Sequence, residues 1–203
     1  MRLFLVRHGE TEYNRRGLAL GRDDVPLNER GVWQARRTGE ALAGEPLAAV
    51  YSSPLKRALA TAEQVAAPHG LAVQVEERLI EMEIGEAEGL TFAEVRERHP
   101  GLLEAWMGAD GPSQPMPGGE RLLDVDERAW AAVGDLAAGH GSEAVAVVAH
   151  NFVILSILTH ALGVPLADFR QLRHSVAAIA ELEFGPESIA AVRMNDTTHL
   201  QPG

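Results

Sequence analysis

The sequence predicts an α/β fold, a three-layer α/β/α sandwich around a mostly parallel sheet. Short apolar runs of strand length recur along the chain, for example at residues 3–6 and 144–149. Segments with apolar residues at helical spacing separate these runs, and such alternation is typical of a parallel sheet covered by helices. The length of 203 residues fits one domain, so we expect residues 1–203 to form a single unit.

The amino-terminal part predicts strands and helices in alternation. Residues 3–6 form an apolar run that stops at a polar turn, as a buried strand does. Asn28 is a suitable N-cap, because its side chain can accept a hydrogen bond from the first helical turn. Pro54 suits the start of another helix. The expected elements are a strand at 3–6, a helix from about 28 to 42, a strand at 48–51, a helix at 55–67 and a strand at 71–75.

The carboxy-terminal part continues the alternation after a long irregular stretch. Thr91 and Glu94 form a capping box before a short helix. Residues 108–119 hold four glycines and three prolines, so they predict a loop, and we expect a mobile lid over a pocket at 100–120. The remaining expected elements are a helix at 122–136, a strand at 144–149, a helix at 151–162 and a closing strand pair at 176–184 and 189–194.

Composition excludes several classes of protein. The formal net charge of -11 opposes binding to nucleic acid, whose affinity depends on Lys and Arg neutralising phosphates. The chain has no cysteine, so it has no disulfide, thiolate nucleophile or cysteine zinc site. No apolar run has the length of a signal peptide core or a membrane span, and a cytoplasmic location is the expectation.

Two histidines end two predicted buried strands. His8 follows the strand at 3–6, and His150 follows the strand at 144–149. In a parallel sheet the carboxyl ends of strands lie at one edge, where ligands bind, so we expect the two side chains at the same edge. Each histidine alone is equally compatible with a structural role. Their joint placement favours a functional site.

Four segments, in this order along nearly the whole chain, carry a resemblance to a known family. They are residues 5–11 (LVRHGET) with Asn14, residues 52–58 (SSPLKRA) with Thr61 and Ala62, residues 78–81 (RLIE), and residues 147–150 (VVAH). This pattern closely resembles the signature of the histidine phosphatase superfamily, the phosphoglycerate mutase-like proteins. The resemblance implies a phosphoglycerate mutase-like fold.

The resemblance also implies roles for individual residues. His8 corresponds to the family's nucleophile, which is transiently phosphorylated. Arg7, Arg57 and His150 correspond to residues that surround the transferred phosphoryl group, and Asn14 to one that donates a further hydrogen bond to it. Guanidinium forks suit this task, because phosphoryl transfer depends on positioning and on stabilising charge at the equatorial oxygens.

Glu81 corresponds to the family's proton donor, and Glu83 is the fallback for that role. A free glutamate is ionised at neutral pH, so burial or the incoming phosphate must raise the pKa of Glu81 if it is to hold a proton. The resemblance implies no cofactor and no metal.

The expected function is hydrolysis of a small phosphorylated metabolite through a phosphohistidine. The main alternative is a cofactor-dependent phosphoglycerate mutase, although mutases of the family have longer insertions and a longer carboxy-terminal segment than residues 195–203 provide. More distant alternatives are a metal-dependent hydrolase using His8, His150 and Glu81 as ligands, and a non-catalytic phosphate-binding protein. No nucleic acid or membrane partner is expected. The sequence leaves open whether the protein forms a homodimer.

Substrate contacts beyond the phosphoryl group are harder to assign. Asn151 and Phe152 follow His150, where many family members have a small pair such as Gly-Gly. Phe152 is expected to belong to the core more than to the pocket. Three residues in or near the expected lid can either contact substrate or simply pack, namely Trp106, Met107 and Met116.

Overall fold

The computed structural model describes residues 1–186 and 188–201, and its core is one six-stranded sheet. The strands lie in the order β3-β2-β4-β1-β5-β6. Their bounds are β1 (Arg2–Arg7), β2 (Leu47–Ser52), β3 (Val73–Val75), β4 (Ala144–Ala149), β5 (Ile179–Phe184) and β6 (Ile189–Asp196).

The sheet is parallel except at one side. β1 pairs with β4, β4 with β2, and β2 with β3, all in parallel, whereas β5 and β6 are antiparallel to their neighbours. The predicted mostly parallel sheet is therefore confirmed, and the predicted closing strand pair forms its antiparallel side. Two strands are shorter than expected, because residues 71–72 and 176–178 lie outside the ladder.

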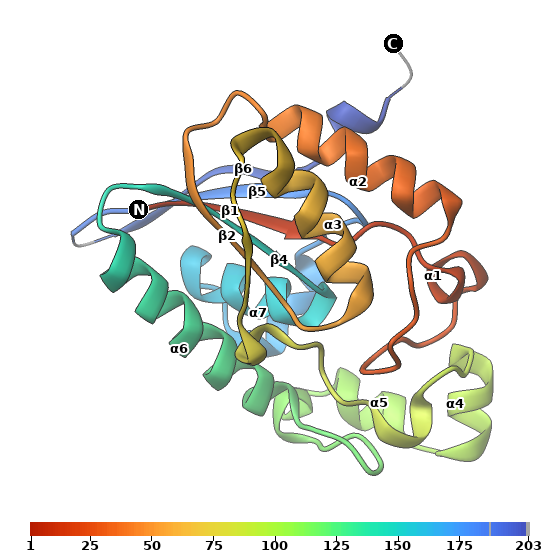
Figure 1. Ribbon diagram of the computed structural model, residues 1–203. Coiled ribbons are helices and arrows are strands. Elements are labelled where there is room, and N and C mark those ends of the chain that lie inside the picture. The colour runs from red at the N-terminus through yellow and green to blue at the C-terminus, as the bar shows by residue number, and fades with distance from the viewer. Residues whose placement is uncertain (187, 202–203) are drawn as a thin grey trace.

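Helices cover both faces of the sheet (Figure 1). Side chains of β1 alternate between the two sides: Leu3 and Leu5 pack in one apolar cluster, and Phe4 and Val6 in another. The first cluster includes side chains of α6 (Leu122–His140) and α7 (Asn151–Leu162), and the second those of α2 (Glu29–Leu42) and α3 (Lys56–Ala66). The three-layer sandwich is confirmed.

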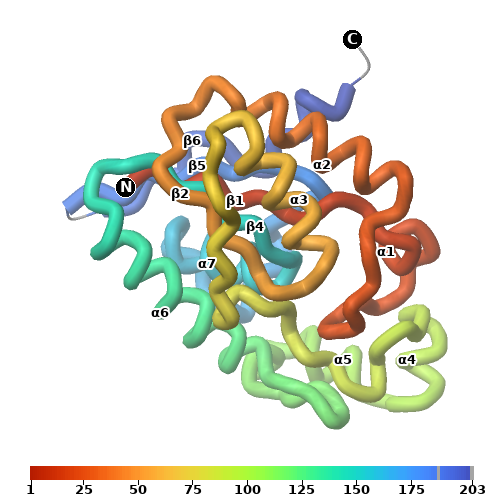
Figure 2. Tube along the Cα trace, in the orientation of Figure 1, coloured from red at the N-terminus to blue at the C-terminus, as the bar shows by residue number. Residues whose placement is uncertain are grey.

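Three shorter helices lie beyond one edge of the sheet, as the Cα trace in Figure 2 also shows. They are α1 (Glu12–Arg16), α4 (Phe92–Arg98) and α5 (Leu102–Met107). The sequence predicted α4 from its capping box, which is present, but not α1 or α5. Helices of five or six residues are too short to show a period. Among the described residues, no helix combines the length and apolar character required to cross a bilayer.

The segment 100–120 combines a short helix with the irregular stretch that its glycines and prolines predicted at 108–119. It begins with α5 and contains a 3₁₀ turn at Gly111–Ser113. Backbone hydrogen bonds join its end to the preceding segment, from the Glu86 N–H to the Pro117 carbonyl (2.8 Å) and from the Glu120 N–H to the Glu83 carbonyl (2.8 Å). Movement of this segment as a lid stays a prediction.

Candidate active site

The site lies at the carboxyl ends of β1 and β4. These strands are neighbours with Arg7 opposite Ala149, so the residues that follow them, His8 and His150, emerge side by side. The backbone N–H of His8 donates to the carbonyl of Ala149 at 3.1 Å, and the two imidazole rings have centroids 5.1 Å apart. The predicted meeting of the two histidines at one sheet edge is confirmed.

A hydrogen bond fixes the tautomer of His8 and leaves its Nε2 atom free. Its Nδ1 lies 2.7 Å from the carbonyl oxygen of Gly9, which can only accept, so Nδ1 carries the proton and Nε2 keeps its lone pair. The side chain is buried, and burial together with the charges of Arg57 and Arg7 holds its pKa well below the ordinary value. His8 is therefore a neutral imidazole at physiological pH, the form required of a nucleophile.

His150 is anchored from a third strand. Its Nε2 lies 2.7 Å from the hydroxyl of Ser53, which follows β2 directly. Its Nδ1 is buried and has no hydrogen-bond partner among the described residues. Burial, and next the charge of Arg57, lower its pKa well below the ordinary value.

Two arginines lie next to His8, of which Arg7 is half-buried and Arg57 is buried. Arg57, on the first turn of α3, is fully buried and donates to the carbonyls of Asp23 (2.7 Å) and Gly21 (2.6 Å). Arg7 donates from Nη1 to the Asn151 side chain (2.9 Å) and to the carbonyl of His174 (2.7 Å). Burial lowers the pKa of Arg7 to about 10, which leaves it cationic at neutral pH.

Buried donors without partners gather around His8. Within the described part of the chain, Nε of Arg7, Nε of Arg57 and Nδ1 of His150 have no hydrogen-bond partner, and the two arginine atoms are N–H donors. A buried polar group without a partner costs about 1–3 kcal/mol, more when charged, so three of them in one place indicate a site for an anionic ligand. The arrangement suits an anion with several oxygens.

Asn14 lies at the rim of the same site. It belongs to α1, where its Oδ1 accepts from the backbone N–H (3.1 Å) and the hydroxyl (3.0 Å) of Thr11. The acceptor side of the amide is thus occupied, which leaves the Nδ2 group as a donor toward the cavity that Asn14 lines.

Glu81 is buried at 2% exposure beside this group. Its carboxylate accepts from the backbone N–H groups of Met82 (2.8 Å) and Phe152 (3.3 Å). Burial is the main cause that raises its pKa, against the opposing effect of those two hydrogen bonds. Glu83, the fallback, is exposed and binds Arg22 instead. The geometry therefore places Glu81, and not Glu83, at the site.

A cavity of about 460 Å³ opens in front of His8. Its walls include Arg7, His8, Asn14 and Glu81 at one end. Arg57 and His150 are fully buried next to His8 and are not among the residues that line the cavity. Of the residues that the sequence could not assign, Trp106, Met116 and Phe152 line the cavity, whereas Met107 is an exposed residue outside it.

Comparison with known proteins agrees with this geometry. A profile of the histidine phosphatase superfamily (branch 1) matches residues 3–197. The chain belongs to the histidine phosphatase superfamily. Members of this superfamily include phosphatases, and the resemblance inferred from the four sequence segments is confirmed.

Several relatives of this histidine phosphatase cover nearly all of it. Phosphoserine phosphatase 1 of Hydrogenobacter thermophilus is 32% identical over 98% of this chain and 94% of the relative. The solved structure of Bacillus stearothermophilus YhfR has a TM-score of 0.91 and 31% identity, and covers 98% of this chain and 99% of its own. A mycobacterial glucosyl-3-phosphoglycerate phosphatase, solved with VO3, has a TM-score of 0.88 and 30% identity, covering 97% of this chain and 99% of its own.

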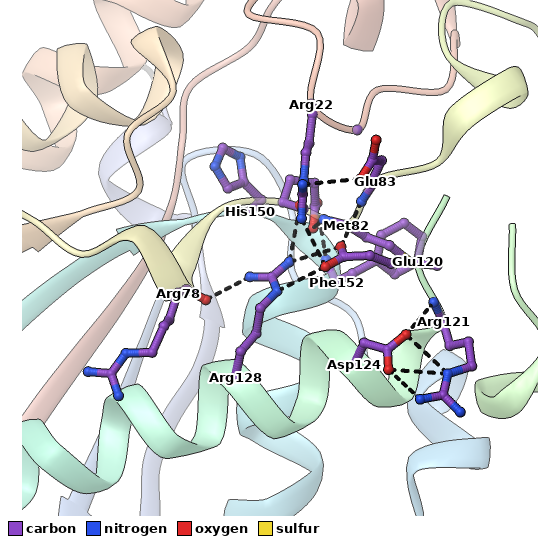
Figure 3. Close-up of polar contacts among 12 residues, drawn as sticks. Arg22, Arg78, Met82, Glu83, Glu120, Arg121, Asp124, Arg128, His150 and Phe152 are labelled. Atoms are coloured by element: carbon purple, nitrogen blue, oxygen red, sulfur yellow. Dashed lines mark hydrogen bonds and ion pairs between the residues drawn. The ribbon is translucent and has the colours of Figure 1, made fainter. Parts of the chain in front are cut away.

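Sequence reasoning missed the residues that hold Glu81 in this histidine phosphatase. Figure 3 shows Arg22 and Arg128 beside Glu120. Arg22 Nε and Arg128 Nη2 both donate to the backbone carbonyl of Glu81, at 3.2 Å and 3.1 Å, and both pair with Glu120, at 2.8 Å and 3.3 Å. No local signal identifies these three residues, because charged residues of this kind are ordinarily solvated. Ser53 belongs to the motif at residues 52–58, but the resemblance assigned no role to it.

Proposed function

We propose that this histidine phosphatase hydrolyses small phosphomonoesters through a covalent phosphohistidine at Nε2 of His8. The observation that carries the proposal is the Nδ1–H bond of His8 to the Gly9 carbonyl, which presents a neutral Nε2 beside unpartnered arginine donors. A neutral imidazole is a competent nucleophile toward phosphorus, and the surrounding donors offset the charge that develops on the phosphoryl oxygens.

In the first step, the Nε2 lone pair of His8 forms a bond to phosphorus while the bond from phosphorus to the ester oxygen breaks. The proton of Glu81 passes to the departing oxygen, so the alcohol leaves neutral. The raised pKa of Glu81 supports this role, since it increases the fraction of carboxyl that holds a proton. Arg7, Arg57, His150 and Asn14 bind the phosphoryl oxygens.

In the second step, water attacks phosphorus and the N–P bond breaks. Glu81, now a carboxylate, takes a proton from the attacking water, and inorganic phosphate leaves. His8 returns to its neutral form, and no cofactor or metal takes part. In the part of the chain that the structure describes, His8, His150 and Glu81 do not form a group of metal ligands, as the two-histidine, one-carboxylate hydrolase would require.

Transfer to water, and not to a second alcohol, can be measured directly. In ¹⁸O-water, turnover of a phosphomonoester is expected to release one inorganic phosphate per alcohol, with one ¹⁸O atom in each phosphate. Mass spectrometry of the phosphate checks this. Recovery of the phosphoryl group on a second hydroxyl, with little free phosphate, would identify a mutase and contradict the proposal.

The pH dependence of kcat is expected to have an alkaline limb set by Glu81. Because the pKa of His8 is lowered, its nucleophilic form is already present below pH 6.5, and the acid limb lies under that value. Because the pKa of Glu81 is raised, its proton persists above the ordinary range and is lost as pH rises through the raised value. Glu81→Gln is expected to lower kcat on an alkyl phosphate at least about 100-fold and to remove this limb.

The control for this experiment is Glu83→Gln, at the exposed neighbouring carboxylate. Both variants are measured from about pH 4.5 to pH 9 on one alkyl phosphate. Glu83→Gln is expected to keep the alkaline fall of the unmodified protein. If kcat of Glu81→Gln fell at alkaline pH as it does in the unmodified protein, the proton transfer would belong to another group.

A further inference from the structure

We infer that the preferred substrates are phosphomonoesters of apolar alcohols, such as medium-chain alkyl or aryl phosphates, and not those of amino acids, sugars or hydroxy acids. The inference rests on the proposed function, because it concerns the group that leaves when His8 takes the phosphoryl group. The cavity in front of His8 supplies the evidence.

The cavity divides into a polar end and an apolar remainder. Thirteen of its twenty lining residues have apolar side chains, whereas Arg7, His8, Asn14 and Glu81 make up the polar end. A volume of about 460 Å³ is of the size that accommodates small-molecule ligands. The apolar wall includes residues from several segments, among them Leu18, Ile84, Phe92, Leu103, Trp106 and Phe152.

An aromatic cluster forms part of the apolar wall of the cavity. The ring of Trp106, on α5, lies 5.5 Å from that of Phe152, on α7, and 5.8 Å from that of Phe169, and Phe152 and Phe169 are 6.0 Å apart. The indole N–H of Trp106 donates to the carbonyl of Gln114 at 3.2 Å. Trp106 therefore offers carbon and no free donor to a ligand, so the wall favours an apolar group.

Two further polar side chains of the cavity each hold one hydrogen-bond partner within the protein. Glu10 accepts from the Asn28 amide (2.9 Å), and Asn151 accepts from Arg7 (2.9 Å). Sugar hydroxyls would lose hydration against the apolar wall without regaining equivalent partners, which costs free energy.

A carboxylate on the leaving group would also lack a cationic partner. Arg7 is the one arginine or lysine among the residues that line the cavity, and it is assigned to the phosphoryl group. Glu10 adds a negative charge to the wall. Arg170 and Arg173 line a neighbouring hollow that shares Arg7 with the cavity, and the Arg170 guanidinium lies 4.7 Å from the centre of the Phe169 ring. Phosphoserine and phosphoglycerates are therefore disfavoured.

The cavity mouth has an exposed aromatic ring. Phe92, at the start of α4, is 70% exposed while it lines the cavity, so it contributes little to the core. A ring in this position gains free energy if an apolar ligand covers it. Phe92 is thus available for contact with the distal part of an alkyl or aryl group.

A homologous series tests the inference. Ethyl, butyl and hexyl phosphate have leaving groups of similar basicity, so they differ mainly in apolar area. We expect kcat/KM to rise about fourfold per methylene, since each buried CH₂ contributes about 0.8 kcal/mol. Phosphoserine and glucose 6-phosphate are expected to fall at least about tenfold below butyl phosphate. A flat series, or a preference for either polar ester, would overturn the inference.

A pair of variants adds a residue-level readout. Phe92→Ala is expected to lower the ratio of kcat/KM for hexyl over ethyl phosphate about fivefold, through lost apolar contact. Met107→Ala is the matched control, because Met107 is 67% exposed but lies outside the cavity wall, and it is expected to keep the ratio. Equal ratios in both variants would remove Phe92 from the substrate site.

Binding measurements separate the two proposals. Calorimetry with His8→Ala protein gives dissociation constants for the same alkyl phosphates without turnover. Tighter binding of longer chains, with no hydrolysis by the unmodified protein, would refute the proposed function and support the apolar pocket. Hydrolysis without dependence on chain length would refute the pocket alone. Absence of both binding and hydrolysis would refute both.

Discussion

Replacing His8 by alanine is expected to reduce turnover of any phosphomonoester about 10⁵-fold or more, in line with the loss of a covalent nucleophile in other enzymes. The reason is that His8 is the one histidine among the residues that line the cavity, so no other imidazole there can replace it as nucleophile. Steady-state assays over a phosphomonoester panel measure this loss.

Trapping of the intermediate gives the second readout for His8. Rapid quenching of the unmodified protein with labelled substrate is expected to yield an acid-labile phosphoprotein, and His8→Ala is expected to yield none. The control is His140→Ala, because His140 precedes β4 at the opposite edge of the sheet, where it contacts Tyr51 and Glu143. Activity close to that of the unmodified protein in His8→Ala would end the proposal of a phosphohistidine.

Replacing Arg57 by alanine is expected to lower kcat/KM about 1000-fold. Removal of one preorganised donor to a transition state costs about 100- to 1000-fold in other enzymes, and Arg57 contributes a full charge in a buried site. The same variant is expected to weaken inhibition by vanadate, which resembles the five-coordinate phosphorus. Steady-state kinetics with and without vanadate measure both effects.

Two further variants separate chemistry from folding. Arg57 also binds the carbonyls of Gly21 and Asp23, so Arg57→Ala can loosen that loop. Arg57→Lys keeps the charge but loses the planar fork, and an intermediate rate is expected from it. Lys56→Ala is the neighbouring control, since the Lys56 side chain is 68% exposed and pairs with Asp24 at the surface. A near-normal rate in folded Arg57→Ala protein would exclude Arg57 from the transition state.

The predicted strands and main helices were confirmed because each has a local signal. Four-residue to six-residue apolar runs mark β1, β2 and β4, and helical spacing marks α2, α3, α6 and α7. The short helices α1 and α5 were not predicted, because they lack such a local signal. They depend on caps and on packing with distant segments more than on a repeating pattern.

The sequence by itself determined which reactive residues meet. His8 and His150 end strands that run parallel, and strands of a parallel sheet bring their carboxyl ends to one edge. The apolar runs that mark those strands are local, so this part of the site could be predicted before any contact was known.

Only the tertiary structure decided how these residues are oriented and what surrounds them. The Gly9 bond that frees Nε2 of His8, the Ser53 bond that anchors His150, and the arginines that hold Glu81 depend on exact side-chain directions. The apolar wall likewise joins residues of α4, α5 and α7, which are far apart in the sequence. Spacing along a chain carries information about neighbours on one element, whereas contacts between elements are set by packing of the whole core.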